Sequence, residues 1–211
     1  MLWICAPVSG AKSPSKNPAK GDGAVAKNIL VLTGSPRKAG NSDLLADAFI
    51  RGAAKSGHKL DKFETAFHHI GGCLGCNGCW SKGTPCVQKD DFNGKLAPGL
   101  EAADMLVFSM PLYAYTFPAQ IKAVLDRLFP YGKEEWMRQL KVAETALILC
   151  GADDEDAPFQ PAVGSYRLLI NYFGWTDRGA LIVPGVSDPG DVRCTDGLQR
   201  AEAFGEGMQS Q

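Results

Sequence analysis

Residues 28–42 read Asn28-Ile-Leu-Val-Leu-Thr-Gly-Ser-Pro-Arg-Lys-Ala-Gly-Asn-Ser42. The run from Asn28 to Thr33 is rich in aliphatic side chains, as is typical of a strand buried on both faces of a parallel sheet. A loop with Gly and Ser follows, and residues 42–56 then place apolar side chains at helical spacing, with Ser42 as the expected N-cap. This succession of strand, short loop and helix predicts the first unit of an α/β fold.

The same alternation continues to residue 183. We expect further strands at 59–64, 104–110, 143–150 and 175–183, and helices at 90–103 (broken near Pro98), 118–128 and 161–173. This pattern predicts a doubly wound parallel sheet, which binds its ligands at the carboxyl ends of the strands. We predict a flexible leader at 1–27, a folded domain at 28–184 with a cysteine loop at 71–88, and a C-terminal tail at 185–211 with a short helix near 197–204.

The composition excludes several classes of protein. The 211 residues suit one domain with appendages, and 22 Lys+Arg against 23 Asp+Glu leave a net charge of -1. No overall positive field therefore attracts nucleic acid or an anionic membrane. Because no apolar run approaches the roughly 20 residues of a membrane span, we expect a soluble protein with no nucleic acid and no membrane as partner.

The seven cysteines are an odd number, and four of them lie within 14 residues. This distribution differs from the disulfide framework of a small secreted protein. We therefore expect the reducing cytoplasm as the location.

The loop after the first predicted strand has the chemistry of an anion site. Backbone N–H groups at the start of a helix, the hydroxyls of Ser35 and Ser42, the Asn41 amide and the Arg37 cation can together enclose a phosphate. The loop matches neither Gly-x4-Gly-Lys-Ser/Thr nor Gly-x-Gly-x-x-Gly. The alternative is an ordinary strand-to-helix turn without a ligand.

An aromatic cluster follows the third predicted strand. It reads Pro111-Leu-Tyr113-Ala-Tyr115-Thr-Phe117. Such a cluster at a strand end can flank a planar ring, and Tyr hydroxyls supply polar contacts in a mostly apolar pocket. The alternative is that these rings pack under a neighbouring loop or subunit.

Together the two motifs resemble the NADPH-dependent FMN reductase family of the flavodoxin-like superfamily. Members carry Gly-Ser-Pro-Arg-x-x-Gly-Asn-Ser/Thr after the first strand and Ser/Thr-Pro-x-Tyr after the third, where this chain departs with Met110. The resemblance implies an α/β, flavodoxin-like three-layer sandwich with a five-stranded parallel sheet in the order 2-1-3-4-5. It also implies a homodimer or homotetramer.

The resemblance further implies the residues that bind FMN. By position, Ser35, Arg37, Asn41 and Ser42 hold the phosphate. The isoalloxazine ring is bordered by Pro111, Leu112 and Tyr113, with Tyr115 of the same cluster as a further candidate, and the pocket is closed by Gly151 and Ala152. The acidic run 153–156 departs from the small residues that relatives often have there.

A third motif places Cys73, Cys76, Cys79 and Cys86 in one Gly-rich loop. Two successive Cys-x2-Cys steps let a short loop wrap three thiolates around a compact cubane, and a fourth cysteine completes the ligands of a [4Fe–4S] cluster. Zinc sites usually draw their ligand pairs from separated segments. The spacing resembles that of the iron–sulfur flavoproteins of anaerobes, a branch of the same superfamily. Free or redox-active thiols and a zinc site remain the alternatives.

Together, these resemblances imply an FMN-dependent oxidoreductase. Flavins need no catalytic acid or base from the protein, so we predict no catalytic residue. The electron donor is either NAD(P)H or a ferredoxin-like carrier acting through the cluster, and the acceptor is a small molecule such as oxygen, peroxide or a quinone. Two alternatives are a nucleotide-binding module with a zinc-stapled loop and no turnover, and thiol–disulfide chemistry through the Cys-x2-Cys steps.

Overall fold

Five aliphatic runs form the strands of one parallel sheet. They are β1 (Asn28–Thr33), β2 (Lys59–Glu64), β3 (Met105–Pro111), β4 (Glu144–Cys150) and β5 (Thr176–Val183). Their order in space is β2-β1-β3-β4-β5, and each neighbouring pair is parallel. The protein is seen here in a computed structural model that describes residues 26–132, 134 and 137–209. The predicted fold class and strand order are confirmed.

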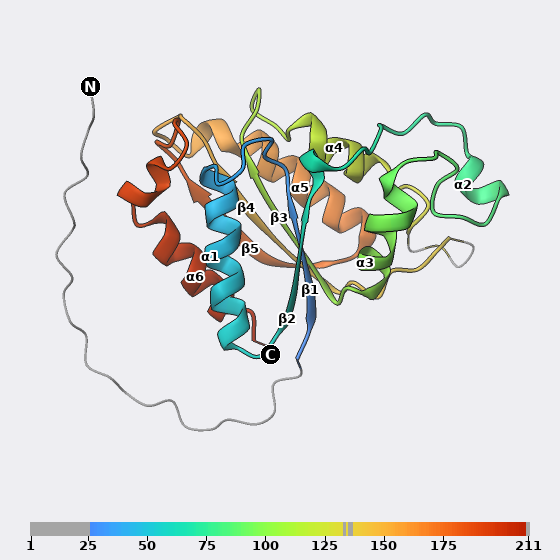
Figure 1. Cartoon of the computed structure of the whole chain (residues 1–211), viewed down its shortest axis with the longest axis horizontal. Helices are drawn as coiled ribbons and strands as arrows, with labels where there is room; N and C mark the ends of the chain where they lie inside the picture. The colour runs from blue at the N-terminus through green and yellow to red at the C-terminus, as the bar shows by residue number, and fades with distance from the viewer. Residues whose placement is uncertain (1–25, 133, 135–136, 210–211) are drawn as a thin grey trace.

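The helices of the described part of the chain cover both faces of the sheet (Figure 1). They are α1 (Asn41–Lys55), a four-residue α2 (Gly78–Ser81), α3 (Ala97–Ala102), α4 (Ala119–Asp126), α5 (Gln160–Phe173) and α6 (Gly197–Glu206). Side chains alternate along each strand, so Val31 of β1 packs in the layer of α1 and α6, whereas Leu32 packs in the layer of α3, α4 and α5. The result is the predicted three-layer sandwich.

Two helices differ locally from the sequence prediction. Ser42 is not the N-cap of α1, because the helix already begins at Asn41 and Gly40 takes the capping position with its carbonyl accepting the N–H of Leu44 at 2.9 Å. The segment with Pro98 is helical, and its geometry changes from one π-helical turn at Phe92–Leu96 to α3, where Pro98 lies in the first turn. Proline is tolerated there because first-turn N–H groups have no intrahelical partner.

The C-terminal segment belongs to the packed domain over the residues that the structure describes. Val186, Val192, Ala201 and Met208 are buried in the layer of α1. Helix α6 lies along α1, as the adjacent red and blue helices in Figure 1 show. The loop between β5 and α6 lies at the carboxyl ends of the strands, beside the start of α1.

Most of the predicted leader, residues 1–25, lies outside the described residues. Lys27, which we assigned to the leader, pairs with Glu144 at 2.7 Å. Within the described ranges, no helix combines the length and the apolar character needed to cross a bilayer.

Candidate functional site

One cavity at the carboxyl ends of the strands gathers most of the predicted site residues. This carboxyl-end cavity, of about 160 Å³, is lined by Ser35, Arg37, Asn41, Ser42, Pro111, Leu112, Tyr113, Cys150, Gly151, Ala152, Val186 and Ser187. All the residues that we expected to bind FMN are among them except Tyr115. Three loops that are distant in sequence, after β1, β3 and β4, meet here because parallel strands end at the same edge of the sheet.

The loop between β1 and α1 is held by its own polar groups. The Ser35 hydroxyl accepts the N–H of Arg37 at 3.1 Å, and the Asp43 carboxylate accepts the N–H of Ala39 at 3.0 Å. Arg37 donates one guanidinium N–H to the Ser187 carbonyl at 3.4 Å. Among the residues that the structure describes, its guanidinium has no other hydrogen bond and no carboxylate partner. The loop is thus preformed, with a cation at the edge of the cavity.

Asn41 makes contacts that the sequence did not indicate. Its Oδ1 accepts the N–H groups of Gly190 (3.0 Å) and Val192 (3.2 Å), and its Nδ2 donates to the Asp188 carbonyl at 2.9 Å. The amide therefore ties the loop after β5 to the start of α1. Any contact of Asn41 with a ligand phosphate is left mainly to its backbone N–H.

The Ser42 hydroxyl lacks a hydrogen-bond partner within the described part of the chain. Its Oγ is buried in the wall of the carboxyl-end cavity without a hydrogen-bond partner. Buried hydroxyls in proteins normally have partners, and the first N–H groups of α1 also lack intrahelical acceptors. A phosphate oxygen at this point would satisfy the hydroxyl and face the positive end of the helix dipole. The residues therefore fit the phosphate of FMN.

Tyr115 turns away from the cavity because of a tight turn. The N–H groups of Tyr113 and Thr116 each donate to the other residue's carbonyl, at 3.1 and 2.9 Å. Between them, Ala114 (φ 47°) and Tyr115 (φ 62°) take left-handed conformations, as in a type I′ turn. Tyr115 is 60% exposed, whereas Tyr113 stays in the cavity wall.

Cys150, Val186 and Ser187 line the cavity but escaped the sequence analysis. Burial raises the pKa of the Cys150 thiol to about 12, so the thiol is neutral at physiological pH. Cys150 ends β4, so its place at the strand end was a usable signal. Val186 and Ser187 lie in the loop after β5, where no motif marks them.

The four clustered cysteines line a second cavity. This cysteine cavity is lined by Cys73, Leu74, Gly75, Cys76, Asn77, Cys79, Pro85, Cys86, Gln88, Asp126, Arg127, Phe129 and Pro130. It shares no lining residue with the carboxyl-end cavity. Its loop, which carries α2, extends beyond α3 and α4 at the end of the molecule away from α6 (Figure 1).

The backbone of the cysteine loop bends sharply between successive cysteines. Gly75 (φ 62°) and Asn77 (φ 54°) adopt left-handed conformations between successive cysteines. Burial raises the pKa of the Cys79 thiol, and the N–H groups of Trp80 and Cys79 oppose that rise in part. Among the residues described, no three His, Cys, Asp or Glu side chains stand close enough to hold a single metal ion. The four cysteines line a shared cavity of about 20 Å³ instead.

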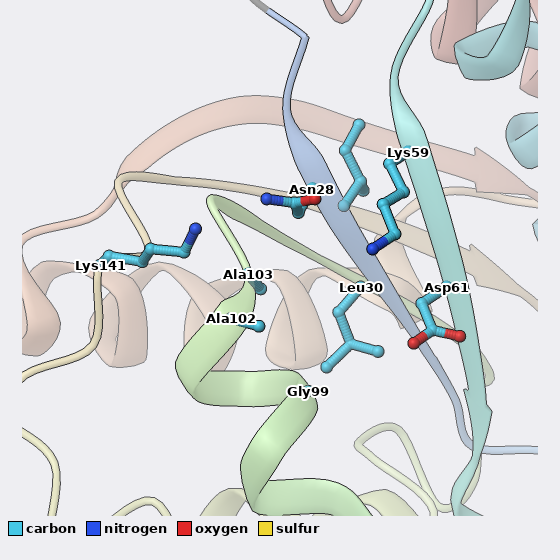
Figure 2. Close-up of a pocket in the computed structure, with 9 residues that line it drawn as sticks. Asn28, Leu30, Lys59, Asp61, Gly99, Ala102, Ala103 and Lys141 are labelled. Carbon is cyan, nitrogen blue, oxygen red and sulfur yellow. The ribbon is translucent and has the colours of Figure 1, made fainter.

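A third hollow lies at the opposite end of the sheet. It measures about 230 Å³ and is formed between the amino ends of β1 and β2, helix α3 and Lys141 (Figure 2). Lys141 pairs with Asp104 at 3.0 Å, and none of the predicted site residues lies here. The cavities at the other end are the ones that bring the motifs together.

A five-stranded parallel sheet with an anion loop after β1 and an aromatic loop after β3, in this order, defines a flavodoxin-like flavoprotein. Comparison with known proteins agrees. A sequence model of the NADPH-dependent FMN reductase family matches residues 27–152. The chain belongs to this family and is an FMN-dependent oxidoreductase. The family uses NAD(P)H as electron donor.

Individual proteins extend the comparison over more of the chain. An iron-sulfur flavoprotein of Archaeoglobus fulgidus is 37% identical over 174 residues, which cover 82% of this chain and 75% of that protein. An iron-sulfur flavoprotein of Methanosarcina thermophila is 30% identical over 157 residues, or 74% and 76% of the two chains. Among solved structures, an NAD(P)H:quinone oxidoreductase from Methanothermobacter marburgensis has the same fold, with a TM-score of 0.69 at 19% identity over 89% of this chain and 98% of that chain.

Proposed function

We propose that this FMN-dependent oxidoreductase holds a [4Fe–4S] cluster on Cys73, Cys76, Cys79 and Cys86. On this proposal it takes single electrons from a ferredoxin-like donor and delivers them, through FMN in the carboxyl-end cavity, to a small acceptor such as oxygen, peroxide or a quinone. The observation that carries the proposal is that all four cysteines of the loop are free and line one cavity. A reducing compartment such as the cytoplasm would keep them available as ligands.

The wall of the cysteine cavity fits an electron-rich sulfur group. Arg127 lines it with a side chain that is 1% exposed, and the Nε–H of this arginine is buried without a hydrogen-bond partner. Such an orphaned donor is uncommon in proteins and costs free energy. A thiolate or sulfide acceptor in the cavity would satisfy it. The names of the Archaeoglobus and Methanosarcina relatives support the same assignment.

When bound, FMN supplies hydride and one-electron chemistry and the cluster supplies one-electron transfer. The protein's task is to bind and orient them. Arg37, Ser35 and the start of α1 would hold the phosphate, and Pro111 to Tyr113 would flank the ring. The neutral Cys150 thiol adds no charge beside the flavin.

The separation of the two cavities supports a proposal about the assembly. Since they share no lining residue and the cysteine loop lies at one end of the molecule (Figure 1), we propose a homodimer or homotetramer in which the loop of one subunit approaches the flavin of another. Light scattering on the purified holoprotein tests this, and a monomer at working concentration would count against it.

Reduction by NAD(P)H without a cluster is the second candidate, because the family match includes the whole anion loop, the loop after β3, and Gly151 and Ala152 after β4. The exposed acidic run 153–156 lies beside Ala152 at the rim of the carboxyl-end cavity. Its negative charge disfavours the approach of an anionic dinucleotide.

The donor experiment separates the two candidates. Flavin bleaching is followed by anaerobic stopped-flow after mixing with NADH, NADPH or reduced ferredoxin, for the wild type and for Cys76→Ala. We expect fast bleaching by ferredoxin only, and loss of that phase in the variant. Bleaching by NADPH at the same rate in both proteins, with none by ferredoxin, would contradict electron entry through the cluster and leave the NAD(P)H-dependent reductase.

Ser42→Ala tests the FMN phosphate site. Because the Ser42 Oγ has no partner in the protein, its removal should leave the stability of the FMN-free protein unchanged or slightly higher. A lost hydrogen bond to a charged phosphate of about 1.5 kcal/mol should weaken FMN binding about tenfold. Calorimetric titration with FMN measures the Kd, and Ser165→Ala on the exposed face of α5 is the matched control. An unchanged Kd would remove Ser42 from the site.

A further inference from the structure

Arg127 joins the two ends of the cysteine loop at a single guanidinium group. It follows the last residue of α4, and its Nη1 and Nη2 donate to the two carboxylate oxygens of Asp90 at 2.6 and 3.0 Å. Nη1 also donates to the Gly71 carbonyl at 3.0 Å. Gly71 precedes the first cysteine and Asp90 follows the last, so Arg127 links the two ends of the loop. We call these contacts of Arg127 with Gly71 and Asp90 the clamp.

The negative partner of the clamp is fully engaged. Asp90 accepts the N–H of Gly71 at 3.0 Å and that of Phe92 at 3.1 Å, in addition to both bonds from Arg127. Burial raises the pKa of Asp90, but Arg127 and these N–H groups outweigh it and hold the pKa below its usual value. Asp90 is therefore an ionised carboxylate that pairs with Nη1 and Nη2 of Arg127.

The guanidinium also borders the cysteine cavity. Its Nε–H is buried without a hydrogen-bond partner of standard geometry among the described residues, and Arg127 lines the cavity. Cys86 is close enough to interact with Arg127 both as a hydrogen-bond partner and through charge, and both interactions raise the pKa of Arg127. The Phe92 ring covers the group at 4.4 Å from its centroid. The other charged side chain in the cavity wall, Asp126, pairs with Lys122 at 2.6 Å.

We propose that Arg127 is the positioning residue of the cysteine loop and that its Nε–H donates to the sulfur shell of the bound cluster, which raises the reduction potential of that cluster. Reduction adds negative charge, and a cationic N–H donor stabilises the reduced state more than the oxidised state. Arg127 lines the cavity, whereas Asp90 is not among its lining residues and binds Nη1 and Nη2 of the guanidinium. This inference rests on the proposed [4Fe–4S] cluster.

The test must avoid leaving Asp90 buried and unpaired, since that alone can unfold a protein. The double variant Arg127→Gln/Asp90→Asn removes both charges but keeps polar side chains at both positions. The variant Arg127→Lys keeps the positive charge but loses the paired Nη donors of the guanidinium. Arg138→Gln is the matched control, because Arg138 also donates to a loop carbonyl, that of Gly83 at 3.2 Å, but does not line the cavity. Each protein is purified without air, and its iron, FMN and cluster potential are measured by redox titration.

We expect the double variant to retain iron and FMN. At a fixed applied potential, its ratio of reduced to oxidised cluster should be about tenfold lower than in the wild type, which corresponds to a fall of about 59 mV in the reduction potential of this one-electron couple. Arg127→Lys should show a smaller fall in the same direction, and Arg138→Gln none. An unchanged potential in an iron-containing variant would overturn the inference. Iron loss from both variants with FMN retained would reduce Arg127 to a clamp and overturn its effect on the potential. A wild type without iron would instead refute the proposed cluster itself.

Discussion

Cys76→Ala is expected to lower the bound iron from about four atoms per chain, the content of a [4Fe–4S] cluster, to less than one. Cys76 lies between Cys73 and Cys79 in the sequence and lines the same cavity. Because its side chain is exposed, its removal disturbs no core packing. A cubane iron that loses its thiolate is open to solvent and oxidation. Iron and sulfide analysis of protein purified without air measures the loss.

The FMN content should stay at one per chain in this variant, because no residue of the cysteine cavity lines the carboxyl-end cavity. Leu74→Ala is the matched control: Leu74 lies in the same loop and cavity wall, is 72% exposed, and offers no metal ligand. It should retain full iron. Full iron in Cys76→Ala would show that this thiol is not a ligand.

Gly52→Ala should destabilise the protein strongly, although it adds only one methyl group. A Cβ at Gly52 of α1 would lie 1.9 Å from the Glu202 carbonyl oxygen of α6, and one at Gly205 would lie 2.1 Å from that of Phe49. Both obstacles are backbone, so the helices must separate. We expect a loss of about 3 kcal/mol in the free energy of unfolding, at the upper end for overpacking, and a fall in Tm of about 6–12 °C.

Gly164→Ala provides the matched control for the helix pair. Gly164 lies within α5, and a Cβ there would meet nothing within 4 Å. Alanine favours helix over glycine, so this variant should be neutral or more stable by up to about 1 kcal/mol. Thermal unfolding of both variants in the presence of FMN gives the comparison. Equal Tm values for Gly52→Ala and the wild type would contradict the close packing of α1 against α6.

The sheet was predictable because each buried strand is a short aliphatic run between turn signals. The strand order came from the family resemblance of the two loops and not from the runs themselves. The close approach of α1 and α6 was not predictable, since Gly52 and Gly205 lie far apart in sequence and look like ordinary helix residues. The N-cap of α1 was misjudged by two residues because Gly40, which carries no capping side chain, took the place expected for Ser42.

The site was predicted best where a motif follows a strand directly. Loops after β1, β3 and β4 met as expected, since parallel strands fix where their carboxyl ends lie. Tyr115 does not line the carboxyl-end cavity because it is the second residue of a two-residue turn with Ala114. Val186 and Ser187 were missed because their loop is placed by the long-range contacts of Asn41. The clamp between Asp90 and Arg127 depends on tertiary packing and carries no local signal.

The most direct test of the central claim is an absorbance spectrum, with iron, sulfide and FMN analysis, of the wild-type protein purified without air. We predict flavin bands together with a broad shoulder near ~400 nm, and about four iron atoms for each FMN, as a [4Fe–4S] cluster requires. Flavin bands with no iron or sulfide, in protein that also fails to take up a cluster on reconstitution, would contradict the cluster and leave an FMN-dependent reductase with a loop of free thiols.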